Sequence, residues 1–87
     1  MRHFASRKFW RQFQALPPEI RQLARENYAL LKQNPAHPSL QFKFVRAGRF
    51  RSVRIGLHYR ALGIPVPEGV QWFWIGSHAE YDRLINS

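Results

Sequence analysis

Hydrophobic residues in the first part of the chain recur every three or four positions, as they do on the buried face of an amphipathic helix. They follow Ser6, a residue type that commonly caps a helix N-terminus, and are Phe9, Trp10, Phe13 and Leu16. The segment Leu16-Pro17-Pro18 ends this first helix, and Pro18 suits the first position of a second one.

The second helix is predicted to run from Pro18 to the Asn34-Pro35 dipeptide, because the residue before a proline avoids helical geometry. Polar and basic residues occupy one side of it. The apolar stripe on the other side comprises Ile20, Leu23, Ala24, Leu30 and Leu31. A helix of about 16 residues would be roughly 24 Å long. The two helices are predicted to form an antiparallel hairpin.

Beyond the loop at residues 35–39 the spacing of apolar positions changes to two, which is typical of β-strands. Strands are predicted over residues 42–45, 50–55, 58–64 and 70–75. The last of these is apolar on both faces, as expected for a strand inside a sheet that is covered on two sides. Residues 2–5 are either a short edge strand or a lead-in to the first helix.

A short helix is predicted to follow the last strand. Ser77 and Glu80 have the S-x-x-E spacing of a capping box, which places His78 in the first helical turn and Tyr81 on the same face as His78. Together the elements predict one α+β domain over residues 1–87. It consists of a small, mainly antiparallel sheet with an N-terminal helical hairpin on one face and a short C-terminal helix.

The charge of the chain points to an anionic partner. Fourteen Lys and Arg residues stand against five Asp and Glu, a formal net charge of +9, while a hydrophobic content of 45% indicates a chain that folds. Without cysteine there is no disulfide, no thiolate metal site and no Cys nucleophile. Since no run of about 18 apolar residues occurs, we expect no membrane partner and a soluble, cytoplasmic protein.

Metal-dependent chemistry is not expected. The acidic residues are scattered along the chain, whereas a two-metal nuclease needs clustered carboxylates, and the four histidines lack the spacing of metal ligands. We therefore expect no metal and no other cofactor. Any nuclease activity should be metal-independent.

Two arginines are candidates for binding a phosphate. With a three-residue turn at residues 56–58, Arg54 would pair with Arg60, and two like charges in that position are tolerated best where an anion bridges them. With a two-residue turn, Arg54 would pair with Tyr59 and the arginines would lie on opposite faces. Both turns are compatible with the sequence, and both arginines could also be ordinary solvated charges.

The C-terminal candidates have alternative interpretations too. Imidazole both accepts and donates protons near neutral pH, which suits His78 to acid–base chemistry, yet a histidine at a helix start is often only a capping or surface residue. Tyr81 either faces the site or is a core aromatic beside Leu84 and Ile85. Trp72 and Trp74 are interpreted as core residues.

Three segments resemble the RelE/ParE superfamily of bacterial toxins. They are His37-Pro38-Ser39-Leu40-Gln41-Phe42-Lys43, residues 53–63 with their Tyr59-Arg60 pair, and residues 72–81 from Trp72 to Tyr81. The resemblance covers nearly the whole chain and implies the compact fold of that family. Many members are ribonucleases that cut messenger RNA, often in the ribosomal A site, and are silenced by an antitoxin. The ParE branch instead poisons DNA gyrase.

The resemblance also implies roles for residues. The catalytic candidates are Arg54, Arg60, His78 and Tyr81. The candidates for binding RNA are Lys43, Arg51 and His58. The chain departs from the family at Ser52, where the best-known nuclease has a second lysine.

The function implied is that of a metal-independent endoribonuclease toxin that inhibits translation. Its partners would be messenger RNA, the ribosome and a cognate antitoxin. In such an enzyme the 2′-hydroxyl of RNA attacks the neighbouring phosphate, aided by an acid, a base and cations around the phosphorane. A gyrase poison and a non-catalytic nucleic-acid-binding domain are the alternatives.

Overall fold

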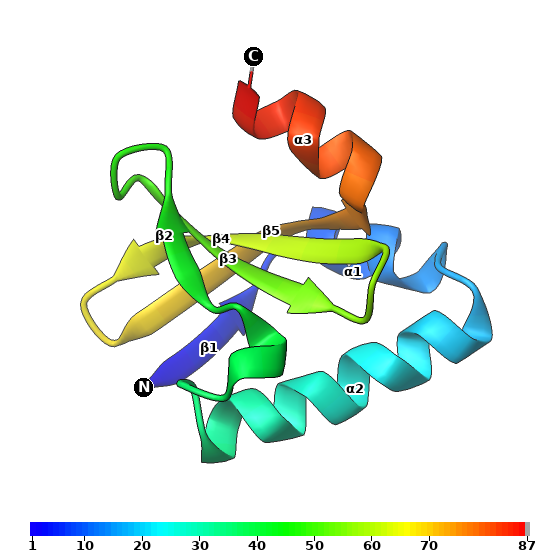
Figure 1. Ribbon diagram of the computed structural model, residues 1–87, viewed down its shortest axis with the longest axis horizontal. Coiled ribbons are helices and arrows are strands. Elements are labelled where there is room, and N and C mark those ends of the chain that lie inside the picture. The colour runs from blue at the N-terminus through cyan, green and yellow to red at the C-terminus, as the bar shows by residue number, and fades with distance from the viewer. Residues whose placement is uncertain (87) are drawn as a thin grey trace.

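A mixed β-sheet separates two layers of helices in the computed structural model, which describes residues 1–86 (Figure 1). The strand order across this five-stranded sheet is β1-β5-β4-β3-β2. The strands are β1 (Arg2–Ala5), β2 (Lys43–Val45), β3 (Phe50–Ile55), β4 (Tyr59–Val66) and β5 (Gly69–Ser77). The helices are α1 (Arg7–Gln14), α2 (Pro18–Gln33) and α3 (His78–Asn86), with a 3-10 turn at Pro38–Leu40. The predicted α+β architecture is confirmed.

The N-terminal segment is an edge strand rather than a lead-in. β1 pairs in parallel with β5, Arg2 opposite Gly69 and Ala5 opposite Trp72, whereas β2 to β5 pair antiparallel. A Cβ atom at Gly69 would come within 1.9 Å of the Arg2 carbonyl oxygen, so the close approach of the two strands requires glycine there. β5 therefore lies inside the sheet, as its apolar pattern predicts.

The helices α1 and α2 cover one face of the sheet. As predicted, Ser6 caps α1 by accepting a hydrogen bond from the Phe9 N–H at 3.1 Å, and Pro18 is the first residue of α2. Arg21 closes the connection between the helices by donating to the Leu16 carbonyl at 2.6 Å. The main hydrophobic core lies between this pair and the sheet. It contains Phe13, Leu31, Val53, Ile55, Val70, Trp72 and Ile75.

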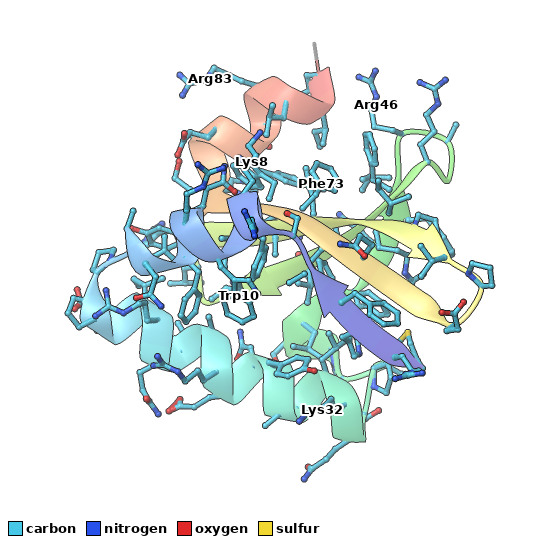
Figure 2. The ribbon with its side chains drawn as sticks, turned by 180° about the vertical axis from the view of Figure 1, so that it is seen from behind. Lys8, Trp10, Lys32, Arg46, Phe73 and Arg83 are labelled. Carbon is cyan, nitrogen blue, oxygen red and sulfur yellow. The ribbon has the colours of Figure 1, made fainter. Side chains whose placement is uncertain are left out.

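A β-bulge in β5 gives the opposite face its own core. Leu62 pairs with Trp74 and Gly63 with Trp72, so Phe73 is an extra residue and the two tryptophans point to opposite sides. Trp72 joins the main core, while Trp74 packs with Leu62 and Tyr81 beneath α3. Figure 2 shows Phe73 on this α3 side. Both tryptophans are buried, as predicted.

Within residues 1–86, no helix has both the length and the apolar character that crossing a membrane would require. The same residues include no group of three or more His, Asp or Glu side chains placed to hold a metal ion.

Candidate active site

The turn between β3 and β4 brings two arginines together. It contains three residues, Gly56, Leu57 and His58, so Arg54 pairs with Arg60, which confirms the first of the two registers that the sequence allows. Gly56 has a φ of 61°, in the left-handed region that favours glycine. Because directly paired residues share a face, both arginine side chains lie on the α3 side of the sheet.

Arg60 is buried, with 6% of its surface exposed, and each of its three side-chain nitrogens donates a hydrogen bond. Its Nε donates to His78 Nδ1 at 3.3 Å, and its Nη1 donates to Ser52 Oγ at 3.3 Å. Its Nη2 donates to Gln41 Oε1 at 2.5 Å. The guanidinium carbon lies 5.1 Å from the centre of the Tyr81 ring. The Tyr81 ring thus covers one face of the planar guanidinium, and the three hydrogen bonds hold its edge.

Burial and neighbouring groups both act on the pKa of Arg60. Burial lowers the pKa of Arg60, as does the positive charge of Arg54, while Tyr81 and Asp82 oppose this lowering. Arg54 is half-buried, and its Nε donates to the Gly56 carbonyl at 2.7 Å. The pair therefore places two cations side by side, one deeply anchored and one more accessible.

His78 is positioned by the start of α3. Ser77 Oγ accepts from the Glu80 N–H at 3.2 Å and Glu80 Oε1 accepts from the Ser77 N–H at 3.4 Å, which confirms the capping box. The His78 N–H donates to the His58 carbonyl at 2.7 Å and so ties α3 to the β3–β4 turn. The helix start and the arginine pair are therefore one unit.

The ring of His78 contacts a partner at each nitrogen. Nδ1 accepts from Arg60, so in the neutral ring the proton is on Nε2, which lies 3.5 Å from Asp82 Oδ2. The side chain is 46% exposed. An exposed imidazole with a defined tautomer, in contact with a guanidinium, is suited to moving a proton beside a bound phosphate.

Tyr81 is both a core residue and part of the site. It is 3% exposed, packs with Leu62 and Trp74, and stacks on the His78 ring with 5.7 Å between centroids. Its hydroxyl is buried and has no hydrogen-bond partner within the described residues. Tyr81 therefore lies beneath Arg60 and His78, and its ring packs against both side chains.

The three predicted RNA-binding residues do not all lie on the same face of the sheet. Lys43 is exposed and pairs with Ser52, so its side chain lies on the same face as Arg60. His58 is exposed in the β3–β4 turn, and its carbonyl holds α3. Arg51 lies on the other face, between the rings of Phe42 and Phe44. The structure therefore does not bring Arg51 into the site with the others.

Three residues of the site were not among the predicted ones: Gln41, Ser52 and Asp82. Asp82 was readable from its i,i+4 spacing to His78. Ser52, the position that departs from the family, accepts from Arg60 and is fully buried. Gln41 has a left-handed φ of 45° and reaches Arg60 from 19 positions away, so no local pattern points to it.

Comparisons with known proteins agree with this architecture. A family model described as the ParE-like toxin domain matches residues 18–83, and the chain belongs to this family, within the RelE/ParE superfamily of toxins. No curated protein is significantly similar to the chain in sequence.

Two solved structures share the fold. A chain of the RelB-RelE antitoxin-toxin complex from Methanococcus jannaschii superposes with a TM-score of 0.70 at 13% identity, over 92% of this chain and 96% of that one. A copper-bound mutant toxin from Helicobacter pylori gives a TM-score of 0.63 at 17% identity, over 92% of this chain and 97% of that one.

Proposed function

We propose that this protein is the toxin of a toxin–antitoxin system and acts as a metal-independent endoribonuclease on messenger RNA at the ribosome. The observation that carries the proposal is the contact between Arg60 and His78 on the face that also presents Arg54. A cation pair beside an imidazole provides what phosphate-ester cleavage needs: charge stabilisation and a group that moves protons.

The proposed reaction begins when the RNA phosphate binds between Arg54 and Arg60. His78, whose side chain is 46% exposed, turns away from the fixed Arg60, so that the hydrogen bond from the Arg60 Nε–H is released and Nδ1 is left free as a base. His78 then takes the proton from the 2′-hydroxyl, whose oxygen attacks the phosphorus. The 5′-oxygen leaves as a hydroxyl after taking a proton from solvent water, and a 2′,3′-cyclic phosphate remains. Tyr81 supports both side chains from below, and Lys43 and His58 bind the RNA beside them.

The test is RNA cleavage in the presence of EDTA, with and without ribosomes. A general acid or base supplies roughly 10²–10⁴-fold in rate, so His78→Ala should lower cleavage by about that factor. Arg60→Ala should also lower the rate. Arg25→Ala is the matched control, because Arg25, a residue of α2, lies over the ring of Phe13 on the opposite side of the sheet. If His78→Ala cleaves as fast as wild type, His78 is not the proton-transfer residue.

A cognate antitoxin is the proposed protein partner. The structural neighbour from M. jannaschii is an antitoxin-toxin complex. Here α1, α2 and the sheet enclose a largely apolar cleft of about 350 Å³, lined by Phe9, Phe13, Tyr28 and Trp72 among others. Trp10, 51% exposed, also lines it, and Figure 2 shows this side chain between α1 and α2. An amphipathic, acidic antitoxin segment would complement the cleft and the charge of +9.

A gyrase poison is the second candidate, because the matching family model is the ParE-like one. The two functions differ in what expression damages. Cut messenger RNA with intact DNA identifies the ribonuclease, whereas intact RNA with accumulated DNA breaks identifies a gyrase poison.

A further inference from the structure

Arg51, which lies away from the catalytic face, is the centre of an aromatic stack. Its guanidinium carbon is 3.6 Å from the ring centre of Phe42 and 4.2 Å from that of Phe44. Phe42 in turn contacts Trp72, with 6.3 Å between ring centroids. The stack therefore runs from the main core outward through Phe42 and Arg51 to Phe44.

The outer end of this stack is open. Phe44 is 56% exposed, while Arg51 and Phe42 beneath it are half-buried. Arg51 is desolvated by this packing, and burial lowers the pKa of its guanidinium. A rigidly supported aromatic ring with an exposed surface, on a basic protein, has the properties of a surface on which a nucleobase stacks.

The position of Phe44 relates it to the candidate active site. β2 is the outermost strand of the sheet, so both of its faces meet solvent along one edge. Lys43, the neighbouring residue, lies on the face of Arg60, and Phe44 lies on the other. A single strand of RNA that crosses this edge can contact Lys43 through a phosphate and Phe44 through a base.

We propose that Phe44, backed by Arg51, is a stacking site for one base of single-stranded RNA that crosses the β2 edge from the candidate active site. The inference rests on the proposed ribonuclease function and adds to it a base subsite on β2. Stacking is tolerant of base identity because every base has a π-face, so the site holds RNA in place without demanding a sequence.

The experiment measures equilibrium binding of a short 2′-O-methyl RNA oligonucleotide, which lacks the attacking hydroxyl, over a series of salt concentrations. Phe44→Ala should weaken binding roughly 5- to 140-fold at fixed salt, the loss expected for one stacked base. The salt dependence should stay as in wild type, because Phe44 neutralises no phosphate. Lys43→Ala should instead reduce the slope of log K against log salt by about 0.7. Phe44→Trp should bind at least as well as wild type.

The controls separate this inference from the proposed function. Ile64→Ala removes another exposed apolar side chain, 45% exposed on β4, and should bind as wild type does. Circular dichroism of each variant confirms the fold. If Phe44→Ala binds equally well, or loses affinity only through a smaller salt slope, the stacking site is wrong and the catalytic proposal stands. If wild type itself shows no salt-dependent binding, both fail.

Discussion

The guanidinium of Arg60 fixes the geometry of the candidate site, because its three acceptors come from three separate parts of the chain. Gln41 follows the 3-10 turn, Ser52 lies on β3 and His78 begins α3. A lysine would deliver its donors from a single point and could not satisfy this arrangement. Arg54, with its bond to the Gly56 carbonyl, has no comparable structural task in the part of the chain described.

Replacing each arginine by lysine should therefore separate structure from chemistry. Arg60→Lys should lower the free energy of unfolding by about 1–3 kcal/mol, because buried polar partners lose their donor. Arg54→Lys should cost less, about 1 kcal/mol or below, because only its single hydrogen bond to the Gly56 carbonyl is at risk. Both should slow RNA cleavage. Urea unfolding measures the first effect, and equal stability losses for the two variants would contradict this view of Arg60.

We expect His3 to make the stability of the fold depend on pH. Its Nδ1 accepts from the Trp72 indole N–H at 3.1 Å, and its ring lies against Trp72 and Tyr28. Burial chiefly, with the N-terminal ammonium group and Lys32, lowers the pKa of His3 from its ordinary value of 6.5. The folded protein thus favours the neutral ring, while the unfolded chain takes up a proton near pH 6.5.

The sign follows from linkage. Above about pH 6.5 the ring is neutral in both states, and the free energy of unfolding is not reduced by His3. As the pH falls below that value toward the lowered pKa of the folded state, the unfolded chain takes up the proton first and the free energy of unfolding decreases. Thermal unfolding of wild type and His3→Gln, which keeps an acceptor but does not titrate, should show this difference between about pH 7 and 5. Identical pH dependence in the two proteins would show that His3 is not responsible.

At the level of elements, helix capping links stability to the site. Ser6 and Ser77 both cap a helix, but only the helix capped by Ser77 carries His78. Removing either cap should cost about 1 kcal/mol. Ser77→Ala should also slow RNA cleavage, because the first turn of α3 loosens, whereas Ser6→Ala should leave cleavage unchanged. Chemical unfolding with cleavage assays checks this pair, and equal cleavage by both would separate the cap from catalysis.

Elements with a clear local signal could be predicted from the sequence. The serine caps, the proline at the start of α2 and the apolar periods define these helices and strands without tertiary information. Contacts across the sheet could not be predicted in the same way. The bulge at Phe73 follows from how Leu62 and Gly63 pair with β5, and the left-handed Gln41 meets Arg60 only in the folded chain.

The candidate site was partly predictable for the same reason. The pairing of Arg54 with Arg60 depended on one turn length, and the position of His78 depended on a local capping box. The location of Arg51 also had a signal, because a residue three positions from Arg54 on one strand points to the other face.

On the scale of the whole molecule, the two faces of the sheet carry separate proposed tasks, except at the β2 edge, where Phe44 extends the proposed RNA contact to the other face. The α3 side presents the arginine pair, His78 and Lys43, and Figure 2 shows Arg46 and Arg83 on the same side. The α1–α2 side presents the apolar cleft with Trp10. RNA cleavage and antitoxin capture should therefore respond to different substitutions.

Trp10→Ala tests this separation directly. The substitution removes an exposed aromatic side chain from the cleft and leaves the α3 face intact, so cleavage of RNA should match wild type. Binding of the co-expressed antitoxin should weaken by more than about 2 kcal/mol if Trp10 is a hot spot of the interface, which is common for tryptophan. Growth arrest by this variant should then persist when the antitoxin is present, whereas wild type is neutralised. If Trp10→Ala is captured and neutralised as fully as wild type, the antitoxin binds elsewhere, and the cleft between α1 and α2 has no part in silencing the toxin.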